Sequence, residues 1–479
     1  MKALAALDSW HERATGPGDD ADERLVEQAA FLFEHAAVHL PERRAAGIDP
    51  VARLRSVQAA MPGVRSELYR ELLAIFAEYG DRHSRFVPPP PWSDHFAYLP
   101  FVVGACVEAG ETMLLVTVSA CAPLRAGDRL VSWNGRPVGE VLRDLTAWQL
   151  GANPAARLAK AVQTLTVRPL ALLPPPEGEV ELVVEGAAGR ASERLRWQVG
   201  DAARLGRDLA ACLPDQSGFE AAPCGLFGRE VRTSAGPIAW IRIPSLRAPA
   251  AELLPALAGL LDQLPRMGLV LDLRGCEEGL VQTGERMLGL FADRPLAPLR
   301  FEMRTTDWLR ELVRTCPALA EWRGPLKAGV AAGRPWSEGR PLTPPELLAA
   351  PARRYPGPLL VLVDALTFST AEMFAAGVQD HGLGKVLGVA PRTGGGGGSA
   401  WSLELFHRLS GDDRFARAPG TGSLRMAVLR CRRTGPNAGR LIEGEGIVPD
   451  FVHEPSRRDL LRADENLVER AARLLGEMR

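Results

Sequence analysis

The sequence of 479 residues lacks the features that mark several large classes of protein. It contains no apolar run of about 18 residues, so a membrane-spanning helix is not expected. Its seven cysteines include no CxxC pair, which argues against a zinc ribbon or a disulfide framework. The formal net charge is only −1, so no basic surplus favours nucleic acid or an anionic membrane. Lysine is scarce, which we attribute to coding bias.

The composition that is present is that of a globular protein. Apolar residues make up 46% of the chain and charged residues 24%. The length predicts about two to four domains. The stretch from Met1 to Trp10 is a poor secretory signal, because Asp8 interrupts a short apolar run. We therefore expect a cytoplasmic enzyme.

Changes of pattern along the chain predict a multi-domain α/β protein. Apolar residues recur at helical spacing between residues 20 and 80, and a proline run, Pro88–Pro91, follows them. The expected units are an N-terminal helical domain (1–88), a β-rich domain (92–200), a linker (201–236), an α/β domain (237–455) with an insertion (294–356), and a C-terminal helix (456–479).

Short apolar strands alternate with helices after residue 237. Strands are expected at 238–243, 269–273, 359–363 and 385–389, and helices at 252–264, 284–292 and 370–379. This alternation is typical of a largely parallel sheet that is buried on both faces. In the β-rich region, Asn134-Gly135 after an apolar run predicts a hairpin turn.

Ser369 is the first candidate for chemistry, because it lies where a strand and a short turn enter a helix. The first N–H groups of that helix would face any negative charge that develops beside the hydroxyl. The pattern also has a structural interpretation, since Ser369 and Glu372 form a capping box. The residues alone leave both interpretations open.

A histidine and two glutamates are candidate partners of a serine nucleophile. His83 lies at the end of the helical region, and a neutral imidazole is the usual base for such a serine. Glu443 and Glu445 lie in a turn near the C-terminal end. Alternatively, His83 is a boundary histidine and the glutamates belong to a solvated turn.

Three further patterns are expected to carry no function. His35 and His39 are four residues apart, but the glutamate of a zinc-protease motif is in the wrong place. The glycine run Gly394–Gly398 lacks the Lys-Ser/Thr of a phosphate-binding loop. Cys276 has an apolar flank that indicates burial rather than reactivity.

An ordered set of motifs resembles the C-terminal-processing and tricorn-core serine peptidases. The set consists of Pro237–Leu246, Asp272-Leu273-Arg274 with Gly279, Phe368-Ser369-Thr370-Ala371-Glu372, Thr393-Gly394-Gly395 and Gly446-Ile447-Val448-Pro449-Asp450, preceded by a PDZ-like segment at Leu124–Val138. Together these matches extend over about four-fifths of the chain, in the family's order.

The resemblance implies a catalytic domain with a crotonase-like fold and Ser369 as nucleophile. It implies an oxyanion hole formed by the N–H groups of Thr370 and of Gly279 in the turn 275–279. The family's lysine base is absent, because glycine occupies its place and Lys385 lies on the preceding strand. The tricorn-like arrangement instead implies His83 as base and Glu443 as its orienting carboxylate, with Glu445 a close rival.

The function implied by the resemblance is a serine peptidase of the C-terminal-processing type. It would act on peptides or unfolded segments, for instance in maturing a dedicated precursor, without a metal or organic cofactor. Homo-oligomerisation is left open, and no nucleic-acid partner is expected. Glu278 replaces a family glycine, and a carboxylate there could hinder the oxyanion. The alternatives are an inactive, peptide-binding relative and a crotonase-like acyl-transfer enzyme.

Overall fold

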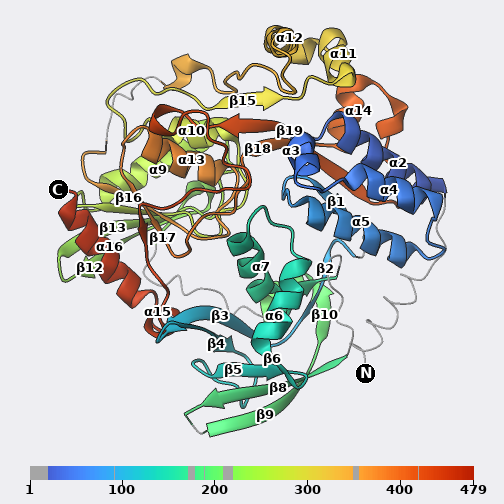
Figure 1. The fold of residues 1–479 in the computed structure, drawn as a ribbon. Helices are drawn as coiled ribbons and strands as arrows, with labels where there is room; N and C mark the ends of the chain where they lie inside the picture. The colour runs from blue at the N-terminus through green and yellow to red at the C-terminus, as the bar shows by residue number, and fades with distance from the viewer. Residues whose placement is uncertain are drawn as a thin grey trace.

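The structure is a computed structural model that describes residues 20–90, 92–170, 178–187, 189–208, 220–348, 355–418 and 420–479. Figure 1 shows a group of N-terminal helices beside a larger α/β body, with a β-rich domain along the lower edge of both. None of the helices in these ranges has the length and apolar character needed to cross a bilayer.

The N-terminal helices match the helical periodicity of the sequence. They are α2 (Asp20–His35), α3 (Leu40–Ala45), α4 (Pro50–Ala59) and α5 (Arg65–Tyr79). Leu25, Ala29 and Leu32 are buried at the spacing of one helix face. Helix α5 ends at Gly80, whose φ of +71° is a left-handed cap. A turn then leads into β1 (Arg85–Val87), which pairs with a strand of the α/β body.

The β-rich domain contains two sheets and two helices. Its elements are β2 (His95–Tyr98), β3 (Phe101–Glu108), β4 (Glu111–Ser119), β5 (Arg129–Trp133), β6 (Arg136–Pro137), α6 (Val138–Ala147), α7 (Pro154–Thr166), β7 (Val167–Pro169), β8 (Glu179–Gly186), β9 (Gly189–Arg196) and β10 (Gln198–Asp201). The larger sheet has the order β3-β4-β5-β8-β9, with β6 paired to β5. The predicted hairpin turn is present, and Asn134 and Gly135 both have positive φ.

The central sheet of the α/β body has the order β11-β12-β13-β14-β16-β17-β20. Its strands are β11 (Glu220–Ala222), β12 (Leu226–Thr233), β13 (Gly236–Arg242), β14 (Leu269–Asp272), β16 (Leu359–Val363), β17 (Lys385–Gly388) and β20 (Phe451–Val452). Pairing is parallel from β13 to β20, as the alternation of strands and helices predicted.

Helices cover both faces of this sheet (Figure 1). One face packs against α9 (Ala250–Gln263), α10 (Val281–Leu288) and α13 (Thr370–Asp380), whereas the other packs against α16 (Glu465–Glu477). The side chains of β16 show the division, because Val361 belongs to the first core and Leu360 and Leu362 to the second. Burial on both faces explains why the strand is apolar at every position.

A second sheet joins the N-terminal helices to the α/β body. Strand β19 (Ser423–Arg432) pairs with β1, with β15 (Arg300–Met303) and with β18 (Gly398–Ser402). The remaining elements are α8 (Ala202–Asp208), η2 (Pro223–Gly225), α11 (Asp307–Thr315), η3 (Pro317–Trp322), α12 (Arg323–Ala331), η4 (Pro345–Leu348), α14 (Leu403–Ser410), η5 (Asp413–Phe415), η6 (Gly435–Asn437) and α15 (Arg457–Leu461).

Two boundary predictions are wrong. Residues 220–233 of the expected linker form β11 and β12, and β12 pairs with β13 along its length. These strands lie at the sheet edge and are mostly half-buried or exposed, which weakens their apolar signal. Residues 209–219 of that linker lie outside the described residues. The expected C-terminal helix is two helices, α15 and α16, separated by Ala463 and Asp464 with positive φ.

Candidate active site

Ser369 lies at a sharp turn between β16 and α13. Its φ of +60° and ψ of −123° are unusual for a residue other than glycine, so the surrounding contacts must hold it there. One such contact is Asp364, whose Oδ1 accepts hydrogen bonds from the Thr367 N–H (2.7 Å) and the Gly275 N–H (3.0 Å). The turn that presents the serine is thereby tied to the turn that follows β14.

His83 comes from the opposite end of the chain and meets this serine. Its Nε2 lies 2.9 Å from Ser369 Oγ, and each residue is only 8% exposed. The imidazole also packs on the Phe368 ring, with centroids 4.6 Å apart. Asp81 accepts the His83 N–H at 2.9 Å and fixes the turn after α5. The pairing of β1 with β19 thus brings together two side chains that are 286 positions apart.

Glu443 completes a buried group with Asp81 and His83. A carboxylate oxygen of each acid and a ring nitrogen of His83 all lie within 4.8 Å of one another. The Gly397 N–H donates to Glu443 Oε2 at 3.2 Å. His83 Nδ1 has no hydrogen-bond partner in the part of the chain that is described, and it lies 4.0 Å from Asp81 Oδ1. Glu445 is instead exposed and pairs with Arg440.

The α3 region supplies two more groups to this cluster. His39 Nε2 lies 3.8 Å from Glu443 Oε2, and an Arg43 nitrogen lies 3.9 Å from Oε1. His39 was expected to carry no function as part of a histidine pair, and its partner in that pair, His35, is not in this cluster. No local pattern predicts its contact with Glu443, because the contact depends on how distant elements pack.

Burial and charge set the protonation of the cluster. Burial, together with the charges of Arg425, Arg82 and Arg85, lowers the pKa of His83 to about 3. Burial raises the pKa of Glu443 well above its usual range, and the charge of Asp81 raises it further. His83 is therefore neutral near pH 7 and can accept a proton, whereas the two carboxyl groups oppose each other's ionisation.

The glycine run Gly394–Gly398 forms a wall of this site, contrary to the expectation that it carries no function. A Cβ at Gly396 would lie 2.0 Å from the Phe368 ring, and one at Gly397 would lie 2.6 Å from Ile442 Cβ. The Glu372 carboxylate accepts hydrogen bonds from the Gly396 N–H (2.7 Å) and the Ser369 N–H (3.0 Å). The run lacks side chains because the backbone passes between the serine turn and Glu443.

The two expected oxyanion donors are both unpaired backbone amides among the described residues. Gly279 forms a parallel bridge with Leu246, and the hydrogen bonds of that bridge are made by Glu278 O and the Leu280 N–H. The N–H of Gly279 itself therefore points away from Leu246. A Cβ at Gly279 would lie 2.5 Å from Leu246 Cβ, which explains the glycine. Thr370 is the first residue of α13, where the amide has no intrahelical acceptor.

The other side chains singled out from the sequence do not take part in the contact between Ser369 and His83. Lys385 forms an exposed ion pair with Asp450 at 3.3 Å. Cys276 is buried, and burial raises the pKa of its thiol to about 12, so it is not a reactive thiolate. Glu278 is held by Arg247 at 2.6 Å.

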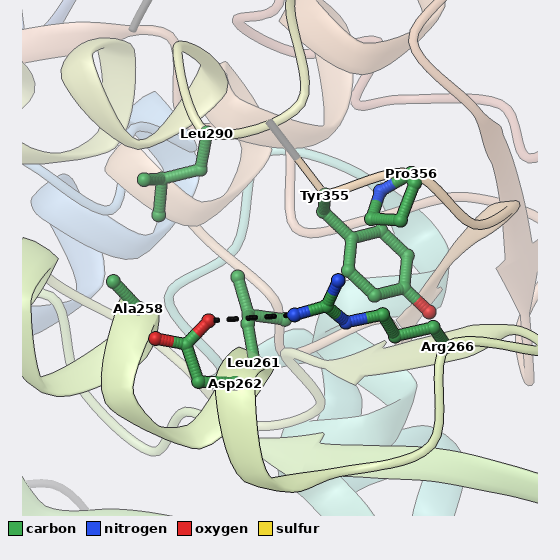
Figure 2. Close-up of a pocket in the computed structure, with 7 residues that line it drawn as sticks. All are labelled: Ala258, Leu261, Asp262, Arg266, Leu290, Tyr355 and Pro356. Atoms are coloured by element: carbon green, nitrogen blue, oxygen red, sulfur yellow. Dashed lines mark ion pairs between the residues drawn. The ribbon is translucent and has the colours of Figure 1, made fainter. Parts of the chain in front are cut away.

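A separate pocket lies on the surface of α9 (Figure 2). It is lined by Ala258, Leu261, Asp262, Arg266, Leu290, Tyr355 and Pro356. The polar contact drawn within it is an ion pair between Arg266 and Asp262 at 3.9 Å. The pocket shares no residue with the serine site, so it gives no guide to the chemistry.

Comparison with known proteins gives two family matches and a likeness of fold. Residues 237–453 match the family model for peptidase family S41, and residues 95–202 match that for a PDZ domain. The solved structure of mature CPAF has a TM-score of 0.72 at 18% identity, covering 95% of this chain and 98% of that one. Mature CPAF complexed with lactacystin gives 0.70 at 17%, covering 95% and 99%. No curated protein sequence matches the chain.

The fold and the family match define a serine peptidase with a PDZ domain before its catalytic domain. Within that class, the catalytic domain, residues 237–453, is the part of the chain that matches peptidase family S41. At these identities the likeness to CPAF is a likeness of fold.

Proposed function

We propose that the chain hydrolyses peptide bonds with Ser369 as nucleophile and His83 as general base. His83 Nε2 takes the hydroxyl proton while Ser369 Oγ attacks the scissile carbonyl, and the imidazolium then gives the proton to the leaving amine. Water, activated by the same imidazole, hydrolyses the acyl-enzyme. The observation that carries the proposal is the 2.9 Å contact between these two atoms at a strained strand-to-helix turn.

Glu443 stabilises the imidazolium in this mechanism by its charge. The cluster within 4.8 Å is nearly dry, and a carboxylate acts more strongly across such a distance there than in water. Asp81 fixes the backbone of His83 and shares the negative charge. Because both acids have a raised pKa, the reactive form requires the pair to lose a proton that it tends to keep.

The N–H groups of Thr370 and Gly279 hold the oxyanion of the tetrahedral intermediate. Both amides lack an acceptor in the described chain, and the Thr370 N–H is at the positive end of α13. The Phe368 N–H donates to Cys276 O at 2.9 Å, which ties the segment before the serine to the Gly279 turn. Glu278 does not fill the hole with a free carboxylate, since Arg247 holds it.

The substrate is a peptide or an unfolded protein segment, and the PDZ domain holds it by strand addition. Helix α7 of that domain already contacts the site. Asn153 Nδ2 donates to Thr393 O at 2.8 Å, and Lys160 pairs with Glu277 at 2.5 Å. Binding at the PDZ domain therefore positions a chain next to the serine. A dedicated precursor is one natural substrate of such an arrangement.

Hydrolysis of a fluorescently labelled unfolded protein tests the proposal. The parent is expected to release peptides, and Ser369→Ala and His83→Ala are each expected to lose the activity by about 10⁴-fold. His407→Ala is the matched control, because His407 lies on α14, where its Nδ1 is 3.1 Å from Asp412 O. Activity that survives Ser369→Ala would contradict the assignment of the nucleophile, and activity that survives His83→Ala would contradict that of the base.

A further inference from the structure

Cationic side chains gather around the turn 275–279, and three of them lie close enough to His83 for their charges to act on it. They are Arg82, Arg85, Lys160, Arg247 and Arg425, which we call the cationic cluster. Among the described residues, the acids that form ion pairs with them are Glu277 and Glu278. A third acid, Asp364, accepts the Gly275 N–H of this turn and acts on Lys160 through its charge. Five cations thus surround three carboxylates, which leaves a surplus of two positive charges in a protein whose net charge is −1.

Glu278 holds three of these cations. Its Oε2 accepts from Arg247 at 2.6 Å, and its Oε1 lies 3.6 Å from Arg85 and 3.7 Å from Arg425. One carboxylate cannot satisfy three guanidinium groups, each of which carries five N–H donors. The nitrogen Arg85 Nε is in fact buried with no hydrogen-bond partner among the described residues.

Arg85 and Arg425 also repel each other across the second sheet. They are directly opposed in the register of β1 and β19, and like charges in that position destabilise a strand pair. Burial lowers the pKa of Arg85, and the charge of Arg425 lowers it further. Such an arrangement is stabilised when an anion lies between the two guanidinium groups.

The cluster extends to the reacting atoms. Arg82 precedes His83 in the chain, and its guanidinium lies 4.5 Å from the centre of the Phe368 ring, next to Ser369. Its side chain is only 12% exposed, and its Nη1 is buried with no hydrogen-bond partner in the described ranges. A buried guanidinium nitrogen with free N–H donors fits an incoming carboxylate, which accepts such hydrogen bonds strongly.

We propose that the cationic cluster binds a carboxylate of the substrate, so that the peptidase favours peptides with an aspartate or glutamate near the scissile bond. Glu278 occupies part of this subsite in the free protein and is displaced from Arg85 and Arg425 as the substrate carboxylate enters. This inference rests on the proposed function for its catalytic consequence, but the binding of the carboxylate does not require catalysis.

The charges explain why such a preference would also change the rate. Arg425, Arg82 and Arg85 each lower the proton affinity of His83. A substrate carboxylate that neutralises part of the cluster makes His83 a stronger base while the substrate is bound. The acidic substrate is therefore expected to have a higher kcat as well as a lower KM.

Peptide binding to the Ser369→Ala protein tests the subsite without hydrolysis. The probe is a set of fluorescent peptides of one neutral sequence, with Asp placed singly within three residues on either side of the central bond and with Asn at the same position as control. An amidated C-terminus in half of the set separates an acidic side chain from a terminal carboxylate as the ligand. Fluorescence anisotropy gives each Kd.

We expect at least one Asp peptide to bind about tenfold more tightly than its Asn counterpart, with or without the amide. Arg425→Gln is expected to remove that difference, and Glu278→Gln to increase it by freeing Arg85 and Arg425. Arg314→Gln is the matched control, because Arg314 pairs with Glu311 on the exposed surface of α11, outside the PDZ domain. It should leave the ratio unchanged.

Equal binding of all Asp and Asn pairs would overturn the inference, as would a preference that survives Arg425→Gln. A preference seen only with a free C-terminus would overturn the assignment to an acidic side chain. The proposed function is tested separately by hydrolysis with the parent protein, so a loss of catalysis and a loss of the carboxylate subsite are distinct results.

Discussion

Two groups of charged residues lie near the Ser369–His83 pair, here called its carboxylate side and its cationic side, and they differ in charge and in exposure to solvent. Around Glu443, two acids whose pKa is raised by burial lie with His39 and Tyr79, and four side-chain atoms are buried without a hydrogen-bond partner in the described residues: His39 Nε2, Tyr79 Oη, His83 Nδ1 and Glu443 Oε1. Around Glu278, half-exposed cations outnumber the acids.

In the proposed mechanism, one histidine is held neutral and still serves as a base. Burial and the cationic cluster lower the pKa of His83, whereas the carboxylate cluster is proposed to stabilise the imidazolium as it forms. The cationic side favours neutral His83, and the carboxylate side favours its protonated form. Changes to the two sides should therefore have different signatures in rate, stability, pH and salt.

The largest expected effect comes from the carboxylate side. Glu443→Gln keeps the shape of the side chain but removes its charge, so the imidazolium loses stabilisation. We expect kcat to fall by about 100-fold or more in hydrolysis of an unfolded protein. Glu445→Gln is the matched control and should change kcat by less than about twofold, since Glu445 is exposed and pairs with Arg440. Equal effects would contradict the assignment of Glu443.

A substitution in the glycine run Gly394–Gly398 tests how tightly the backbone is packed between the serine turn and Glu443. Gly396→Ala places a Cβ 2.0 Å from the Phe368 ring, so the ring or the loop must move. We expect a loss of about 1–3 kcal/mol in the free energy of unfolding, measured by urea denaturation, and a loss of activity. Gly476→Ala, in α16, meets nothing within 4 Å and should not destabilise the protein. A Gly396→Ala protein as stable and active as the parent would contradict this account.

The pH dependence separates the imidazole from the acids. A base acts in its neutral form, and a pKa of about 3 keeps His83 neutral throughout the ordinary range. Loss of kcat/KM on acidification is therefore expected to follow the raised pKa of the Asp81–Glu443 pair, as the pair takes up a proton. Glu443→Gln should abolish or shift that transition. If kcat/KM instead fell with the usual pKa of histidine in both the parent and the Glu443→Gln protein, this assignment would be contradicted.

The smallest effect concerns salt. Half-exposed charges are screened when the Debye length falls to about 3 Å near 1 M ionic strength. Added salt should weaken the binding of Asp peptides to the cationic cluster several-fold and leave the fluorophosphonate reactivity of the buried pair almost unchanged. The check is a NaCl titration of both signals. If peptide binding and fluorophosphonate reactivity depended equally on salt, the distinction between the cationic and the carboxylate side would be lost.

Local patterns were sufficient to predict most of the fold. The helices before residue 80, the turn at Asn134 and Gly135, and the buried strand at 359–363 all have strong local signals, and each is present. The edge strands of 220–233 were missed because they are largely exposed and pair with the sheet only in the folded chain.

The site was only partly predictable. Ser369, His83 and Glu443 could be named from motifs, and the structure brings all three together. The contacts of His39 and of the glycine run could not be predicted, because they depend on how distant elements pack. Arg82 and Arg425 likewise have no local signal, since their role follows from their surroundings rather than their neighbours in sequence.

The most direct test of the central claim is reaction of the parent protein with a fluorophosphonate probe, followed by mass spectrometry of the digested adduct. The account predicts one adduct, on the peptide that contains Ser369, and its loss in His83→Ala but not in His407→Ala. An adduct on another serine, or labelling of Ser369 at the parent rate in His83→Ala, would contradict it.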